Sequence, residues 1–264
     1  MFSIVVIDCV VMSVRLDKFL CKSTAYTRNE AIAIIQQGRV WVNEVCISAE
    51  STQVHENNCI TLDDVRLVMR PSRYLMLNKP QGYACSNVDG DYPSIMGLLD
   101  FERIDDLHIA GRLDVDTTGL VLITDDGRWS FNIIRPDMLC HKVYRVGLRD
   151  DPTSPKAKIS FDELVEKFKT GIQLQGEVGL TQPAKLELVA RGERSEGMHG
   201  EENRQANCEV LLTITEGKYH QVKRMFAAVG NRVVSLHRHS IGKIELDVEE
   251  GGYRYLSEEE VASV

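Results

Sequence analysis

The sequence predicts an α+β protein with two domains: a small unit of two helices and a short sheet, then a larger mixed or antiparallel sheet with flanking helices. Length is the first indication, because 264 residues exceed the roughly 100–200 of one ordinary domain. Periodicity is the second. Residues 15–38 show helical spacing of apolar residues, whereas strand-like runs with a few separate helices dominate from residue 74 onward.

The composition excludes several classes of protein. Hydrophobic residues make up 43% of the chain and charged residues 27%, which excludes disordered and collagen-like chains. The seven cysteines are odd in number and form no CxxC pair, so we expect no disulfide framework and a reducing, cytoplasmic environment. The net charge of −8 means that any nucleic-acid site must be a local basic surface.

Residues 1–12 are predicted to be an N-terminal extension outside both domains. The apolar run from Phe2 to Val11 is about half as long as a membrane helix, and Asp8 interrupts it. The run also lacks the basic start of a signal peptide, so we predict neither membrane insertion nor secretion. Met12, directly before the first patterned segment, is the start codon that we favour.

Residues 13–62 are predicted to form the first domain. Apolar residues share one face of a first helix, and Thr27 with Glu30 forms a capping box at the start of a second. Residues 39–43 alternate like a strand, and residues 59–62 are predicted to be the closing strand.

Mixed charge and a proline in residues 63–72 indicate a linker, which leaves residues 73–264 as the second domain. Two apolar runs are predicted to be buried strands, at residues 74–77 and 120–123. Further strands are predicted at residues 143–148, 184–190, 207–215 and 232–236, and helices at residues 161–170 and 221–229. Residues 191–206 lack periodicity and are predicted to be a loop, to which we assign no function.

Polar residues gather directly before the second buried strand, in the segment GRLDVDTTGL at residues 111–120. The mouth of a strand is a usual position for a catalytic group. The residues alone leave three interpretations open: a structural turn, a metal site, and a catalytic carboxylate supplied by Asp114 or Asp116.

Four motifs together resemble those of the RsuA-type pseudouridine synthases. The most specific is Gly-Arg-Leu-Asp-x-x-Thr-x-Gly-Leu, and the order along the chain is Leu77–Gly82, Gly111–Gly127, His141–Tyr144 and Glu216–Met225. The unit ahead of them resembles an S4-type RNA-binding domain, an arrangement that this family has. The resemblance extends from about Arg15 to Val264.

The resemblance implies isomerisation of a specific uridine to pseudouridine in small-subunit ribosomal RNA or in its assembling ribonucleoprotein. The C1′–N1 bond of the nucleotide breaks, the base rotates, and a C1′–C5 bond forms. A uridine in folded RNA must leave its stack to be reached. The rearrangement is redox-neutral and transfers no external group, so no cofactor is implied, and we expect a monomer.

The resemblance also assigns roles to residues. Asp114 is the catalytic aspartate, Tyr144 stacks on the target base and is placed to assist proton transfer, and Leu236 forms the floor beneath the base, with Arg112 also in the base pocket. Whether Asp114 adds to the base, attacks C1′ or takes a ribose proton stays open.

A cation beside Asp114 would favour its charged form, and Lys223 is the best candidate. Lys223 stands where relatives often carry arginine, which would offer a bidentate fork instead of a point charge. Arg224 and Arg112 therefore stay open as alternatives.

Two basic surfaces are predicted to face phosphate groups. Residues 203–243 carry seven Lys or Arg against two Glu, whereas residues 244–264 carry one Arg against seven acids. The predicted RNA contacts are Arg15, Lys18, Arg28 and Arg39 in the first domain, and Lys142, Lys218, Arg224 and Arg238 in the second.

Four other hypotheses are compatible with parts of the sequence. One is a synthase that acts on large-subunit RNA, and another is a catalytically silent RNA-binding factor for ribosome assembly. The third is a glycosidase-type pair of Asp114 and Asp116, against which stands the rule that alternate strand residues point to opposite faces. The fourth is a metal site at these aspartates or at His237 and His239, which is not expected because no further ligand completes either set.

Overall fold

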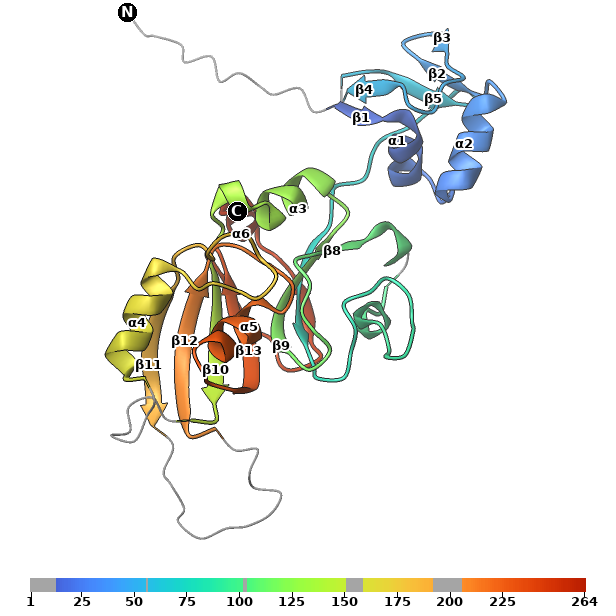
Figure 1. Cartoon of the computed structure of the whole chain (residues 1–264). Helices are drawn as coiled ribbons and strands as arrows, with labels where there is room; N and C mark the ends of the chain where they lie inside the picture. Colours follow the sequence, from blue (N-terminus) through green and yellow to red (C-terminus); the bar gives the residue numbers. More distant parts are fainter. Residues whose placement is uncertain (1–12, 56, 102–103, 151–158, 192–205) are drawn as a thin grey trace, which may run out of the picture. The chain divides into compact units, whose positions relative to one another are not determined.

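The computed structural model describes residues 13–55, 57–101, 104–150, 159–191 and 206–264 (Figure 1). The predicted N-terminal extension and most of the predicted loop at residues 191–206 lie outside these ranges. The chain divides into two compact units, Met1–Pro71 and Ser72–Val264, with the division inside the predicted linker. Within the described ranges, no helix is both long and apolar enough to cross a membrane.

The first unit contains two helices and two small sheets. Its helices are α1 (Leu16–Ser23) and α2 (Arg28–Gln36), and β1 (Ser13–Arg15) pairs with β4 (Gln53–His55). The four-stranded sheet has the order β3 (Val45–Cys46), β2 (Val40–Val42), β5 (Ile60–Leu62), β6 (Val65–Arg66). The capping box is confirmed, because Thr27 Oγ1 accepts from Glu30 N and the Glu30 carboxylate accepts from Thr27 N at 2.8 Å.

The predicted linker starts too early. Strand β6 pairs with β5 inside it, since Asp63 and Asp64 adopt φ of 48° and 66° and turn the chain back. Two successive residues in the left-handed region form the hairpin turn that matches the twist of paired strands, and aspartate tolerates this conformation. The sheet of the first unit therefore extends to Arg66.

The second unit is built on a nine-stranded mixed sheet, as predicted. Its main order is β11 (Lys185–Arg191), β12 (Cys208–Ile214), β10 (Lys142–Leu148), β13 (Val233–Ile241), β9 (Thr118–Thr124), β7 (Tyr74–Lys79), β15 (Tyr253–Tyr255), with β8 (His108–Ala110) on β9 and β14 (Ile244–Glu245) on β13. All pairs are antiparallel except β13 with β9, which are parallel. Figure 1 shows β10, β12 and β13 side by side.

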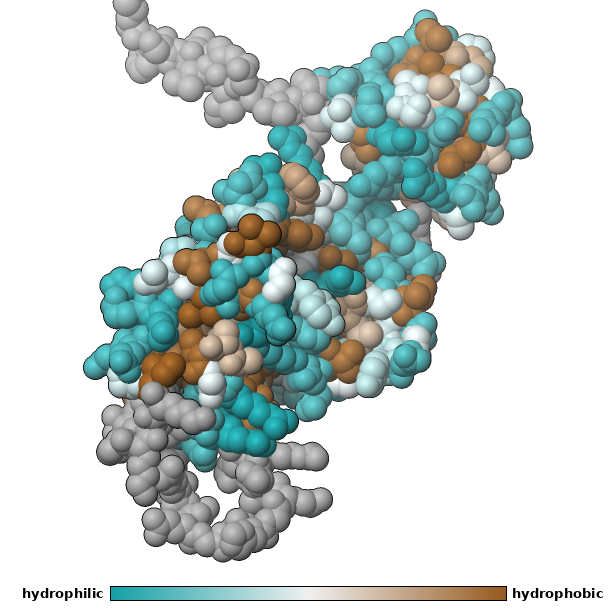
Figure 2. All heavy atoms as spheres, in the orientation of Figure 1, coloured by the Kyte–Doolittle hydropathy of each residue, from teal (hydrophilic) through white to brown (hydrophobic). Residues whose placement is uncertain are grey.

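Both faces of this sheet are covered. On β9, Val121 and Ile123 join the core with helices α4 (Phe161–Thr170) and α5 (Gln221–Ala228), whereas Leu120 and Leu122 join the core with α3 (Gly127–Ile134) and the segment around α6 (Glu258–Ala262). Short 3-10 turns complete the unit: η1 (Ile95–Leu98), η2 (Ile104–Asp106) and η3 (Pro136–Met138). The face drawn in Figure 2 is mainly hydrophilic, with apolar patches between the polar side chains.

Gly119 allows β9 and β13 to approach closely. Its φ is +103°, and a Cβ on it would lie 2.7 Å from the backbone nitrogen of Arg238 and even nearer to the backbone oxygen of that residue. A side chain at this position would therefore be both strained and obstructed by backbone.

We expect Gly119→Ala to lower the free energy of unfolding of the second unit by about 3 kcal/mol, because strain and a backbone clash act together. Gly127→Ala is the matched control, since a Cβ there meets nothing within 4 Å, and its effect should stay within about 0.5 kcal/mol. Urea unfolding followed by the fluorescence of the buried Trp129 measures both. Equal midpoints for the two variants would contradict the close approach.

Candidate active site

The segment between β8 and β9 contains a tight turn. The Thr117 nitrogen donates to the Asp114 oxygen at 3.1 Å, which closes a β-turn over residues 114–117. Asp114 Oδ2 lies 3.1 Å from Lys223 Nζ, and Asp116 Oδ1 lies 2.6 Å from the same atom. The expectation that the two carboxylates point to opposite faces is therefore wrong, because they leave a turn and not a strand.

Lys223 lies in the first turn of α5 and joins both carboxylates. Burial alone would lower the pKa of Lys223, but hydrogen bonds and charge from Asp116 and Asp114 outweigh it and raise the pKa above 10.5. Burial likewise opposes ionisation of Asp116, yet the hydrogen bond from Lys223 lowers the pKa of Asp116 below 3.8. Lys223 and Asp116 therefore stay charged at neutral pH, and with the Asp114 carboxyl group they form the charged cluster of this site.

His220 also contacts Asp114, and sequence reasoning missed it. Its Nε2 lies 3.3 Å from Asp114 Oδ1, and its backbone has a φ of +47° directly before α5. The available signal was its position three residues before Lys223, one turn away on the same side of a helix start.

Lys79, at the end of β7, is hydrogen-bonded to the backbone of the turn that carries Asp114. Its side chain is fully buried, and Nζ donates to the carbonyl oxygens of Pro80, Val115 and Thr117 at 3.0, 3.1 and 2.7 Å. Burial lowers the pKa of Lys79. Sequence reasoning placed this lysine in a motif but gave it no role. A lysine between an apolar strand and a proline was the signal.

Arg238 is a structural cation and not a surface RNA contact. Its side chain is 1% exposed, with Nε donating to the Leu120 oxygen and Nη2 to the Gly111 oxygen, both at 2.7 Å. Nη1 donates to the Tyr144 hydroxyl at 3.4 Å. The guanidinium therefore joins both ends of the segment that carries Asp114 to strand β10.

Lys142 is a second correction of the same kind. It is 5% exposed, and Nζ donates to the carbonyl oxygens of Cys140 and Ile133 at 3.1 and 3.4 Å. Burial lowers the pKa of Lys142. The prediction that it faces RNA at the surface is wrong.

The residues expected to contact the base lie on the α5 side of the sheet. Tyr144 on β10 is opposite Arg238 on β13, and Leu236 is opposite Val146 on the same pair of strands. Tyr144 and Leu236 are 7% and 8% exposed and belong to one core. Arg112 is exposed on the loop before the turn.

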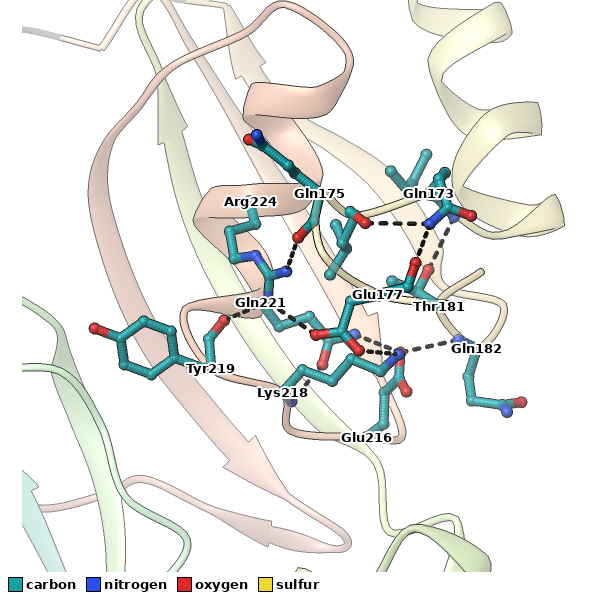
Figure 3. Close-up of polar contacts among 12 residues, drawn as sticks. Gln173, Gln175, Glu177, Thr181, Gln182, Glu216, Lys218, Tyr219, Gln221 and Arg224 are labelled. Atoms are coloured by element: carbon teal, nitrogen blue, oxygen red, sulfur yellow. Dashed lines mark hydrogen bonds and ion pairs between the residues drawn. The ribbon is translucent and has the colours of Figure 1, made fainter. Parts of the chain in front are cut away.

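Lys218 and Arg224 bind an acidic side chain that sequence reasoning missed (Figure 3). Glu177 accepts from Arg224 at 3.3 Å and from Lys218 at 3.5 Å, while Arg224 Nη2 donates to the Gln175 oxygen at 2.7 Å. Both cations keep about a quarter of their side chains exposed. Lys223, and not Arg224, is therefore the partner of Asp114.

The cations of the first unit have different surroundings. Arg15 and Arg28 share the buried Asp17 carboxylate at 2.9 and 3.2 Å. Arg39 is paired at the hairpin turn before β6. Lys18 is exposed, and its ammonium makes no ion pair or side-chain hydrogen bond within the described residues. Two of the four cations, Arg15 and Arg28, thus share one buried carboxylate.

A groove lies beside the charged cluster, lined by Lys223 and by the segment from the end of α5 to the start of β13, including Arg232. In the described part of the chain, no three His, Cys, Asp or Glu side chains are placed to hold a metal. His237 instead has its Nδ1 2.9 Å from Thr118 Oγ1.

Comparison with known proteins identifies two matching family models. Residues 73–228 match the RNA pseudouridylate synthase model, and residues 14–58 match the S4 domain. The chain is 49% identical to the ribosomal small subunit pseudouridine synthase A of Vibrio vulnificus and 44% identical to that of Escherichia coli, over 95% of this chain and 99% of each relative. A crystal structure described as a pseudouridylate synthase is 43% identical, with a TM-score of 0.62, covering 95% of this chain and 99% of that one.

We expect Lys223→Met to raise the pKa of Asp116, because burial then acts without the ammonium. In the wild type, the lowered pKa of Asp116 contributes stability above pH 3.8 that is lost as the pH falls through the lower value, and the variant should lack this contribution. Carboxyl-carbon NMR titration measures the change. Lys169→Met, which removes an exposed lysine paired with Glu166, should leave the pKa of Asp116 unchanged. An Asp116 pKa that is the same in both variants would disprove the contact with Lys223.

Proposed function

The chain belongs to the RNA pseudouridylate synthase family, and we propose that it converts one uridine of small-subunit ribosomal RNA to pseudouridine. The similarity to enzymes named for the small subunit covers both the S4 unit and the catalytic unit, which supports this substrate. Its partner is the free RNA or an assembling ribonucleoprotein. The enzyme binds this partner in the cytoplasm and acts as a monomer.

The observation that carries the proposal is the placement of Asp114. Its carboxylate is partly exposed in a turn that Lys79 and Arg238 fix, and Lys223 and His220 set its direction. A carboxylate fixed in this way can act on the target nucleotide without first reorganising. The atoms then balance within one nucleotide: the C1′–N1 bond breaks, the C1′–C5 bond forms, and the C5 proton is released as N1 gains one.

The base would be held on the α5 side of the sheet. Tyr144 and Leu236 lie on neighbouring strands there, and the Tyr144 hydroxyl is bonded to Arg238, which also holds the loop of Asp114. An aromatic ring and an aliphatic side chain offset part of the cost of taking a uridine out of its stack. The RNA on either side of the target uridine would follow the groove from Lys223 toward Arg232.

A catalytically silent binding factor is the second candidate. Such a factor needs basic surfaces but not a partly exposed aspartate held by a lysine, a histidine and two buried cations. The structure of the cluster therefore favours an enzyme. A sister activity on large-subunit RNA remains the alternative in substrate choice.

We expect Asp114→Asn to abolish tritium release from small-subunit RNA labelled at uridine C5, with a loss on the order of 10³-fold or more. The asparagine has the same shape, so RNA affinity should change by about twofold at most. Asp162→Asn, at an exposed position on α4, is the control and should release tritium like the wild type.

Three results would change the proposal. If Asp114→Asn released tritium at the wild-type rate, the Asp114 carboxylate would have no catalytic role. If the wild type released tritium from large-subunit RNA alone, its substrate would be large-subunit and not small-subunit RNA. Binding by the wild type without release from either RNA would establish the silent factor.

We also expect Lys18→Gln to weaken RNA binding equally for all sequences and to reduce the slope of log affinity against log salt by about 0.7–0.9, one phosphate contact. The exposed ammonium of Lys18 is the group of the first unit that is best placed for such a contact. Lys169→Gln serves as the control for a lost surface charge. Equal slopes for both variants would remove Lys18 from the RNA-binding surface.

A further inference from the structure

Tyr219 is the most exposed aromatic residue among those that the structure describes. Its side chain is 77% exposed, compared with 57% for Phe131 and 54% for Tyr255. A single exposed apolar residue is common on protein surfaces and by itself indicates nothing. Tyr219 differs from the others in its neighbours and in the hydrogen bonds that hold its backbone.

One face of the Tyr219 ring is covered by the His220 ring. The two centroids are 3.9 Å apart and the planes are inclined by 16°, which is a stacked arrangement. His220 in turn reaches Asp114, with Nε2 3.3 Å from Oδ1. The Tyr219 ring, the His220 ring and the Asp114 carboxylate therefore follow one another in space, and the open face of Tyr219 is at the far end of this series.

The loop that carries this pair is anchored from inside. Gln221 Nε2 donates to Glu216 Oε1 at 2.6 Å, and both side chains are less than 8% exposed. The Gln182 nitrogen donates to the same oxygen at 2.9 Å, and the Lys218 nitrogen donates to Gln221 Oε1 at 2.8 Å. The backbone beside Tyr219 is thus fixed by buried polar groups.

A second set of contacts holds Tyr219 itself. Arg224 Nη1 donates to the Tyr219 oxygen at 3.1 Å and also binds Glu177. Figure 3 shows the Tyr219 ring pointing away from this network. An aromatic ring that is exposed while its backbone is held loses little further conformational entropy on binding, which is the property of a preorganised contact.

The chemistry of the site indicates what the ring binds. When a uridine leaves its stack, the adjacent base loses a stacking partner, and an aromatic side chain can replace that partner for any base. The neighbouring cations Lys218 and Arg224 suit the phosphates of the same strand. We propose that the open face of Tyr219 stacks on the nucleobase next to the target uridine.

This inference rests on the proposed function and makes Tyr219 a substrate-binding residue. Stacking of one base is worth a factor of about 5 to 150 in affinity. Tyr219→Ala should therefore raise KM about tenfold with kcat nearly unchanged, and Tyr219→Phe, which keeps the ring, should behave like the wild type. Phe131→Ala, which removes an exposed ring on α3, is the matched control and should change neither constant.

The deciding experiment pairs protein and RNA changes. Tritium release is measured with the wild type and Tyr219→Ala on small-subunit RNA in which each of the nucleotides flanking the modified uridine is made abasic in turn. At one position, the abasic site should raise KM about tenfold for the wild type and have no further effect for Tyr219→Ala.

Each other outcome overturns a specific claim. Release by the wild type without such coupling at any flanking position refutes the stacking contact and leaves the proposed function intact. A fall in kcat with KM unchanged in Tyr219→Ala refutes the stacking contact with RNA and makes Tyr219 only a support for the His220 ring. Absence of release by the wild type overturns the proposed function and this inference together.

Discussion

The catalytic unit depends on two buried cations that are satisfied by backbone oxygens. Arg238 and Lys79 each lie in the interior, where an unpaired charge would be very costly. Their hydrogen bonds end on the carbonyl groups of Gly111, Val115 and Thr117, so the segment that carries Asp114 cannot move without leaving a buried charge unsatisfied. The position of the Asp114 carboxyl group is therefore set by main-chain contacts that are independent of its own side chain.

The sequence predicted those features that depend on local periodicity and turn chemistry. The α+β class, the helix at residues 161–170 and the capping box at Thr27 are confirmed, because each depends on neighbours within a few positions. Strand β13 was predicted only to residue 236, because the apolar pattern ends there. Two of the polar residues that continue it, Arg238 and Ser240, are buried by contacts with distant segments, which local spacing does not report.

The direction of charged side chains was the least predictable part of the site. Arg238 and Lys142 stand among basic residues and were expected at the surface, yet strand pairing turns them inward. One signal was present: Arg238 is two residues beyond Leu236 on β13, and alternate residues of a strand share a face. The local basic charge counted from the sequence thus includes both exposed cations, which are available to bind RNA, and buried cations, which stabilise the fold.

The geometry of Lys223 has a consequence for which residues this position accepts. An ammonium directs three hydrogens toward separate acceptors, and here two of the acceptors are the carboxylates of Asp114 and Asp116. A guanidinium instead holds its N–H donors in one plane, so two carboxylates can bind it only along the edges of that plane, as Asp247 and Glu260 bind Arg254. An arginine in place of Lys223 would therefore keep both partners only if the carboxylates of Asp114 and Asp116 moved into that plane, so the residue at position 223 constrains the orientation of both carboxylates.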